Sequence, residues 1–503
     1  MPFSPTPVLP GTSPLPAPGQ QPPSKRALRT GALITLPILV LSLVVGQLFL
    51  NRLLFLLPSL QAQAGIAVAG AGSAQFQGFV YTWTRRDRDA NSGYTSPTSL
   101  KNMQSEAKDF HMNTVVIPVV ADMPLRNDSY IAWHNKDRND VDTLPEGDYV
   151  QAIKDAQKAG LTPILELQVH QQDVLRSQGD ESGSLVGTSW SDSHSSDNIA
   201  NNNGALVNVG KLERAWFDTY TAFAVHYAQL SAQNHLPFFI IGNDLVNVSY
   251  DTTETNAKND PRGIDRNVPG DSCPQDASGR RECEWRHVVT AIRAQTYSLL
   301  SDHKKSASGG GYTGKLIYAA NWSGASDGGL SDPEFEKITW WDAVDFIGVD
   351  AYFPLTQNQL DPPLDQLIDA WHGKGTSLGL PSKLANIYDR LGKVAATFDR
   401  SLVFTAAGYA SVPSSNSAAF QTSNVTSSPD QAEQANDMRA LLLTFSDTVW
   451  WSGVFWSADR PIPRDKQPNW AVNSGWAGPT LPTSKQAGQW LASYYKTVPV
   501  PTN

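Results

Sequence analysis

The stretch "KAGLTPILELQVH", residues 158–170, joins the end of a helix to the start of a strand. Residues 147–159 have a helical pattern, and Gly160 directly after them is a residue that commonly ends a helix. In the strand, apolar residues alternate with the polar residues Glu166, Gln168 and His170. Because successive side chains of a strand point to opposite faces, these three polar side chains share one face. The stretch therefore predicts a helix that leads into a strand with one apolar and one polar face.

The same order of strand and helix is repeated along the chain. Eight segments are mostly short, apolar and rich in β-branched or aromatic residues, as strands buried on both faces should be. They are 77–83, 113–120, 162–169, 237–242, 315–320, 344–350, 401–405 and 451–456. Helical patterns lie between them, at 99–111, 147–159, 210–232, 284–303, 333–342, 382–398, 430–446 and 484–496. Eight strand–helix units predict a (β/α)8 barrel. The structural alternative is a doubly wound open sheet, but no glycine-rich phosphate turn follows the first strand.

Polar and aromatic residues gather at the C-terminal ends of the predicted strands. They are Trp83, Asp122, His170, Asn243, Asp244, Asn321, Trp322, Asp350, Tyr352, Thr405, Tyr409 and Trp456. Long loops follow the strands, at 170–208, 245–283, 351–381 and 406–429, and such loops build the active-site face of a barrel. A mixture of polar groups and aromatic rings suits the hydroxyls and apolar faces of a sugar. Each residue alone could be core packing, but together they predict a substrate-binding rim, with Glu166 as a deeper, structural carboxylate.

Composition narrows the class of partner. The 503 residues contain 39 Lys and Arg against 48 Asp and Glu, a net charge of −9, and the body of the chain has no long basic run. Nucleic acid is therefore not expected as a partner, since phosphate binding needs clustered basic residues. Fifteen tryptophans are compatible with a large core or with sugar binding. The nine histidines lack spaced partners, so we expect no metal site and no cofactor.

The N-terminal region predicts export. Residues 1–30 begin with a proline-rich, uncharged segment and are expected to form a disordered cytoplasmic tail. Residues 31–50 carry no charge, follow Lys25, Arg26 and Arg29, and are long enough to span a membrane. We therefore expect a signal-anchor at 31–57, a linker at 58–75 and the barrel at 76–497, outside the cell membrane. The alternative is a cleaved signal peptide, with "QAQAG" at 61–65 as its cleavage site, which would make the protein secreted.

The two cysteines agree with export. Cys273 and Cys283 lie ten residues apart in the polar stretch "DSCPQDASGRREC". A pair this close in an exported chain predicts a disulfide that staples a loop, because a zinc site would need closer spacing and further ligands.

Several strands resemble those of glycoside hydrolase family 113, the β-mannanase-type barrels of the large retaining clan. The resembling stretches are "GFVYTWTRRD" in strand 1, "IIGNDL" in strand 4, "LIYAANW" in strand 5, "VDFIGVDAYFPL" in strand 6, "LVFTAAGYAS" in strand 7 and "GVFWSADRP" in strand 8. The resemblance covers about residues 75–495, and strands 6 and 7 are its most specific parts. It implies a TIM barrel and a β-1,4-mannan-type polysaccharide or oligosaccharide as partner.

At two positions the chain departs from this family. The resemblance places Asp244 where the family has its acid/base glutamate, and Ala406 where it has its nucleophilic glutamate. A retaining glycosidase needs two carboxyl groups about 5–5.5 Å apart, one to attack the anomeric carbon and one to protonate the leaving oxygen. Alanine cannot attack, and aspartate withdraws the second carboxyl by one methylene. The standard retaining machinery is therefore expected to be incomplete.

Three functions remain open from the residues. The first is a hydrolase with altered machinery, in which Asp244 protonates the leaving group and Asp350 or Asp459 activates water, with inversion and carboxyls about 6.5–9.5 Å apart. The second is a barrel that binds glycan without cutting it, and the third is a scaffold for a protein partner in the cell envelope. Hydrolysis lost in Asp244→Asn would favour the first. Glycan binding without cleavage, weakened by Trp322→Ala or Trp456→Ala, would favour the glycan-binding barrel. The absence of both binding and cleavage would favour the scaffold.

Overall fold

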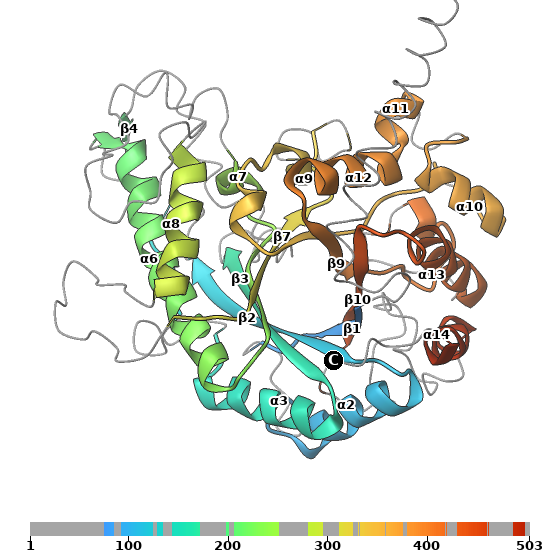
Figure 1. Ribbon diagram of the computed structural model, residues 1–503, viewed down its shortest axis with the longest axis horizontal. Coiled ribbons are helices and arrows are strands. Elements are labelled where there is room, and N and C mark those ends of the chain that lie inside the picture. Colours follow the sequence, from blue (N-terminus) through green and yellow to red (C-terminus); the bar gives the residue numbers. More distant parts are fainter. Residues whose placement is uncertain are drawn as a thin grey trace, which may run out of the picture. The chain divides into compact units, whose positions relative to one another are not determined.

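Eight parallel strands close into a barrel in the computed structural model of the chain (Figure 1). The structure describes residues 75–84, 92–123, 128–133, 143–171, 198–200, 206–250, 280–294, 311–324, 330, 332–357, 359–375, 380–417, 419, 430–459, 461 and 486–497. The barrel strands are β1 (Phe76–Tyr81), β2 (Thr114–Met123), β3 (Thr162–Gln171), β6 (Phe238–Asn243), β7 (Lys315–Asn321), β8 (Phe346–Asp350), β9 (Ser401–Ala407) and β10 (Trp451–Asp459). Their order around the barrel is β1-β10-β9-β8-β7-β6-β3-β2, so the first and last strands pair. The predicted (β/α)8 barrel is confirmed, and the open sheet is excluded.

Helices surround the barrel in Figure 1. The longer ones are α2 (Pro97–Asp109), α3 (Glu146–Ala159), α6 (Val209–Gln233), α8 (Arg280–Ala294), α10 (Leu364–Trp371), α12 (Ile387–Phe398), α13 (Gln431–Phe445) and α14 (Gln486–Thr497). Short elements are α7 (Val246–Ser249), α9 (Glu334–Lys337), α11 (Ser382–Ala385), and the 3-10 helices η2 (Trp341–Ala343) and η3 (Ser415–Ser417). A hairpin of β4 (Asn198–Ala200) and β5 (Leu206–Asn208) stands apart from the barrel sheet.

The helix predicted at 382–398 is divided in the structure. Asn386 lies between α11 and α12, and its side-chain oxygen accepts a hydrogen bond from the backbone N–H of Asp389. A side chain that caps a helix in this way starts a new helix, so the two segments do not merge. Helix α10, helix α7 and the β4–β5 hairpin were not predicted; α7 and α10 lie within two of the long loops that follow strands.

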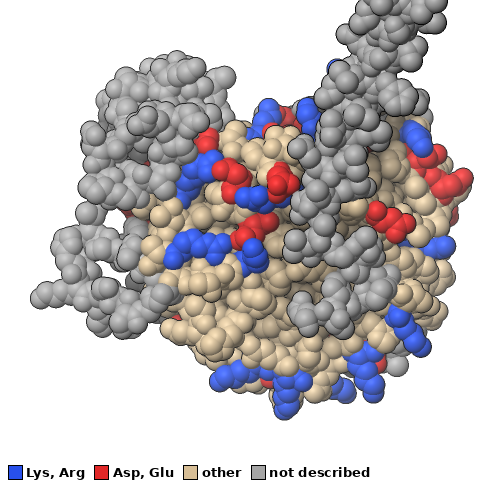
Figure 2. All heavy atoms as spheres, in the orientation of Figure 1, with Lys and Arg blue, Asp and Glu red and all other residues tan. Residues whose placement is uncertain are grey.

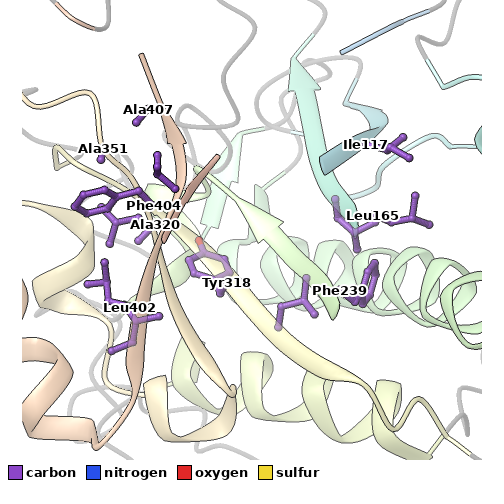
Figure 3. Packing of buried hydrophobic residues seen from close by; sticks show 14 of the residues in the cluster. Ile117, Leu165, Phe239, Tyr318, Ala320, Ala351, Leu402, Phe404 and Ala407 are labelled. Carbon is purple, nitrogen blue, oxygen red and sulfur yellow. The ribbon is translucent and has the colours of Figure 1, made fainter. Parts of the chain in front are cut away.

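Two groups of apolar side chains hold the barrel. A small cluster fills its interior, and its buried members are Phe76, Val80, Val116, Ile164, Ile240, Ile317, Ala319, Val403 and Phe455. A larger cluster lies between the strands and the helices, and it includes Leu165, Leu167 and Val169 of β3. Figure 3 shows part of this outer layer, with Leu402, Phe404 and Ala407 along β9 and with Tyr318 and Ala320 along β7. The outward direction of the apolar β3 residues confirms the predicted alternation, so the polar residues of β3 face the barrel axis.

The described surface carries charges of both signs. On the face shown in Figure 2, basic and acidic side chains are interspersed, and a broad uncharged area lies beside them.

The predicted tail, anchor and linker at 1–75 fall almost wholly outside the described residues. Among the helices that the structure describes, none is long and apolar enough to cross a membrane. Cys283 is buried in α8, and Cys273 lies outside the described residues. The described part of the chain holds no free cysteine, and the pairing of Cys273 with Cys283 stays a prediction.

Candidate functional site

An amide and two carboxyl groups form the centre of the candidate site. Asn243, the last residue of β6, donates through Nδ2 to Oε1 of Glu166 on β3 at 2.5 Å and to Oδ2 of Asp350 on β8 at 2.8 Å. Asp350 also accepts a hydrogen bond at Oδ1 from the hydroxyl of Thr405 on β9, at 2.7 Å. Four strands therefore direct polar side chains to one place at the carboxyl end of the barrel, as the polar face of β3 predicted.

The environment of these carboxyls changes their acidity. Burial raises the pKa of the Glu166 carboxyl well above its usual range, and the neighbouring Asp350 carboxylate raises it further. Burial also raises the pKa of Asp350 to about 6, although the hydrogen bonds from Thr405 and Asn243 lower it. Two acids that contact one amide nitrogen do not ionise independently, because the charge on one disfavours the charge on the other. The pair therefore retains a proton to a higher pH than two separate carboxyls would.

Asp244 stands next to this centre in an uncommon backbone conformation. Its φ is 53°, in the left-handed region that aspartate adopts more readily than most residues. Its backbone N–H donates to the carbonyl oxygen of Ala319 at 3.0 Å, and its carboxylate accepts a hydrogen bond from Nδ2 of Asn321. The oxygen of the Asn321 side chain is held in turn by the backbone N–H of Ser323 at 2.8 Å and by its hydroxyl at 3.0 Å. The direction of the Asp244 carboxylate is thus set by β7.

Ala406 lies on the inner side of an irregular stretch of β9. Leu402 and Phe404 belong to the outer cluster, and the next member along β9 is Ala407, three residues later. Pairing with β8 shifts at the same place, from Val349 opposite Phe404 to Asp350 opposite Ala406. One extra residue in a strand places two successive side chains on the same side, so Thr405 and Ala406 both face the interior. The methyl group of Ala406 therefore lies beside Asp350, and this residue keeps 8% of its surface exposed.

Tyr352 completes the group. Its hydroxyl forms a hydrogen bond with Ser457 of β10, and Ser457 also donates to the carbonyl oxygen of Ala407 at 3.4 Å. Burial raises the pKa of Tyr352, and the charges of Asp350, Glu166 and Asp244 raise it further. The structure thus brings together seven residues of the predicted site: Asn243, Asp244, Asn321, Asp350, Tyr352, Thr405 and Ala406.

Three predicted aromatic residues do not reach this group. Trp456 is fully buried in the outer cluster and donates through Nε1 to the hydroxyl of Tyr495 on α14 at 2.9 Å. Tyr409 is fully buried against α13, where its carbonyl oxygen accepts a hydrogen bond from Gln434 at 2.7 Å. Trp83 is buried and packs against Gly93: a Cβ added at Gly93 would lie only 2.7 Å from Nε1 of Trp83. Trp456 and Tyr409 pack the barrel wall, and the prediction that they line the rim is wrong; for Trp83, which keeps 8% of its surface exposed as Asp244 does, it stays a prediction.

Two other predicted residues lie at the edge of the site. Trp322 packs edge-to-face on Phe353, with ring centroids 6.1 Å apart, and is buried apart from 7% of its surface. His170 is on the same face of β3 as Glu166 and stands in register with Asp122 of β2. The side chain of Asp459, the other predicted base, lies outside the described residues.

Glu334 was missed in the sequence. It is the first residue of α9, it is fully buried, and it accepts hydrogen bonds from the hydroxyl of Tyr318 at 2.7 Å and from the backbone N–H of Asn321 at 2.6 Å. A glutamate in the first turn of a short helix is ordinarily read as a solvated residue that favours the helix start. No signal in the sequence marked it as buried beneath the site.

Three carboxylates elsewhere are spaced closely enough for a metal ion. The ligand atoms of Asp361, Asp430 and Glu433 lie within 4.8 Å of one another. Glu433 is already held by protein donors, among them the backbone N–H of Ser414 at 2.9 Å and Nδ2 of Asn416 at 2.5 Å. Asp430 caps α13. These contacts give the group a structural role in joining α13 to the loop after β9.

Comparison with known proteins agrees with this architecture. A model of Glycoside Hydrolase Family 113 matches residues 272–469, a range that includes β7, β8, β9 and β10 but not Asp244. The solved complex structure of a GH113 β-1,4-mannanase has 15% sequence identity to this chain and a TM-score of 0.55. The match covers 84% of this chain and 99% of the mannanase chain. The GH113 β-mannanase of Alicyclobacillus acidocaldarius is 16% identical with a TM-score of 0.53, covering 86% and 99%. A search of curated proteins returned no match. The predicted resemblance to family 113 is confirmed, and the solved structures show the same fold.

Proposed function

We propose that this family 113-like barrel binds a β-linked polysaccharide of the mannan type at the carboxyl end of its strands and does not cleave it by the retaining mechanism. One observation carries the proposal: the side chain on the inner side of the β9 bulge, beside Asp350, is the methyl group of Ala406. Double displacement needs a carboxylate that attacks the anomeric carbon, and a methyl group has no lone pair to attack with.

The remaining polar groups suit binding. Asn243, Asn321, Asp350 and Tyr352 offer donors and acceptors from β6, β7, β8 and the loop after β8, and each is fixed by a partner within the protein. Fixed polar groups bind hydroxyls with little loss of conformational entropy. Both oxygens of Asp350 already accept hydrogen bonds from protein donors, as expected of a group that orients a ligand.

The test is to measure binding and cleavage on the same preparation. Isothermal titration calorimetry with β-1,4-mannan oligosaccharides should give a measurable affinity, and a reducing-sugar assay over the same time should give no release. Tyr352→Phe removes one hydroxyl inside the site and should weaken binding, whereas Tyr388→Phe removes a hydroxyl that contacts Thr448, outside the site, and should not. A chain that binds neither mannan nor other β-linked polysaccharides would refute the proposal.

A second function is favoured by the acidity of Asp350. Its pKa of about 6 would let it act as a general base near neutral pH, with Asp244 as the acid, in an inverting hydrolysis. Release of reducing sugar with inversion at the anomeric carbon, lost in both Asp244→Asn and Asp350→Asn, would establish this function in place of simple binding.

The location of the barrel is part of the proposal. The charge pattern around residues 31–50 supports a single-pass anchor with the barrel outside the cell, where polysaccharide is available. Retention of the full chain in membranes after alkaline washing, together with cleavage of the barrel by protease added to intact cells, would support the anchor. Release of the barrel into the medium would support the cleaved signal peptide instead.

A further inference from the structure

Glu334 joins two segments that carry the candidate site. Its Oε2 accepts from the backbone N–H of Asn321, at the end of β7, at 2.6 Å. Its Oε1 accepts from the hydroxyl of Tyr318, on the outer face of the same strand, at 2.7 Å. It is also hydrogen-bonded by the side chain of Ser249, in the short helix α7 that follows Asp244. Glu334 therefore contacts both Asn321 and the segment that continues from Asp244.

Helix α9, which begins at Glu334, closes the turn after β7. The backbone N–H of Glu334 donates to the carbonyl oxygen of Ser323 at 3.1 Å, and Ser323 donates twice to the side-chain oxygen of Asn321. Because Ser323 holds the side-chain oxygen of Asn321, the amide nitrogen Nδ2 points the other way, where it donates to the Asp244 carboxylate. The first residue of α9 thus fixes the backbone of Asn321 and, through Ser323, the rotation of its side chain.

We propose that Glu334 is a positioning residue for the glycan site, which holds Asn321 so that Asn321 in turn holds the carboxylate of Asp244. The proposal rests on the function proposed above. Glu334 itself is fully buried beneath the site, so it acts through Asn321. Without it, the buried N–H of Asn321 and the hydroxyl of Tyr318 lose an acceptor, and the turn can relax.

The ionised form of Glu334 holds Asn321 more strongly than the neutral form. A hydrogen bond to a charged carboxylate is roughly twice as strong as one between neutral groups. Burial raises the pKa of Glu334 to about 7; the hydrogen bonds from Ser249, Asn321 and Tyr318 lower it, and the charge of Asp350 on β8 raises it. These groups, on α7, β7 and β8, face Glu334 from the elements around it. Glycan affinity should therefore fall as the pH drops below 7, in addition to any effect of Glu166 and Asp350.

The experiment compares three variants of the full chain with β-1,4-mannan oligosaccharide as the probe, by calorimetry between pH 5.5 and 8.5. Glu334→Ala should weaken binding by about tenfold, as loss of a hydrogen bond to a charged group predicts. Glu334→Gln keeps the shape and one acceptor but cannot ionise, so it should recover most of the affinity and flatten the pH profile. The matched control is Glu336→Gln, on the same helix, which removes the partner of Arg390 and should bind as the wild type does.

Two outcomes would overturn the proposal: a Glu334→Ala variant with unchanged affinity and pH profile, or a Glu334→Gln variant that loses affinity as fully as Glu334→Ala. Crystal structures of the unliganded Glu334→Ala and Glu336→Gln variants separate this proposal from the function on which it rests. Asn321 should turn away from Asp244 in the first structure alone. If Asn321 turns away and the wild type binds no glycan, only the proposed function fails; if Asn321 stays in place, the positioning role fails.

Discussion

At the scale of single residues, the site depends on shared hydrogen bonds. The amide nitrogen of Asn243 donates to both Glu166 and Asp350. The carboxylate of Glu334 accepts from both Tyr318 and Asn321. Each buried acid is therefore partly compensated, yet burial still raises its pKa. Acids with raised pKa values bind their proton more tightly in the folded chain than in the unfolded one, so they make stability depend on pH.

The pH dependence predicted for Glu334 has a definite sign. Its pKa rises from 4.5 to about 7 on folding, so its contribution to stability is fully present below pH 4.5 and is lost as the pH rises to 7. The free energy of unfolding of the wild type, minus that of Glu334→Gln, should therefore fall by about 3 kcal/mol over this interval, at about 1.4 kcal/mol per unit of pKa shift. Urea unfolding at half-unit pH steps measures this difference. A difference that rises with pH would contradict the raised pKa.

A second prediction at this scale concerns the missing carboxylate. Ala406→Glu combined with Asp244→Glu would place two glutamates where the resemblance to family 113 has its acid/base and nucleophile. The double variant should release reducing sugar from β-1,4-mannan above the level of the wild type, because the inner side of the β9 bulge directs residue 406 beside Asp350. Ala407→Glu with Asp244→Glu is the control, since residue 407 faces the outer cluster. A folded double variant without activity would count against carrying the family 113 resemblance over to positions 244 and 406.

At the scale of strands and helices, the sequence predicted the elements well and the faces less well. All eight strands were found because each is short, apolar and set between helical patterns. Trp456 was placed at the rim, but β10 continues to Asp459, and the inward residue is Ser457. The bulge at Thr405 could not be read, because it depends on pairing with β8.

The start of α13 gives a prediction at this scale. Asp430 is its N-cap, and its carboxylate accepts hydrogen bonds from the backbone N–H groups of Ala432 at 3.1 Å and of Glu433 at 3.0 Å. Asp430→Ala should lower the free energy of unfolding by about 1 kcal/mol, because two donors lose their acceptor. Asp430→Asn keeps the capping oxygen and should cost little. Thermal unfolding of both variants checks this, and equal losses would show that charge, not capping, is the role of Asp430.

At the scale of the whole molecule, the barrel is closed by one seam between the first and last strands. Phe76 and Gly453 are partners across the seam, which continues through Phe79 opposite Trp456. The polar site draws on β3, β6, β7, β8 and β9, and Ser457 of β10 joins it through Tyr352. Ser457 reaches Tyr352 across β9, through the pairing of β10 with β9 and of β9 with β8.

Gly453 is where closure is most sensitive to substitution. Its φ of 133° is strained for any residue with a Cβ, and a Cβ there would lie 2.0 Å from the carbonyl oxygen of Phe76. Gly453→Ala should therefore lower the free energy of unfolding by at least about 2 kcal/mol, from strain and overpacking together. Gly147→Ala is the control, because a Cβ at this position in α3 meets nothing within 4 Å, and alanine favours a helix. Urea unfolding of both variants measures the contrast. A Gly453→Ala chain as stable as the wild type would mean that the pairing of β1 with β10 can shift without cost.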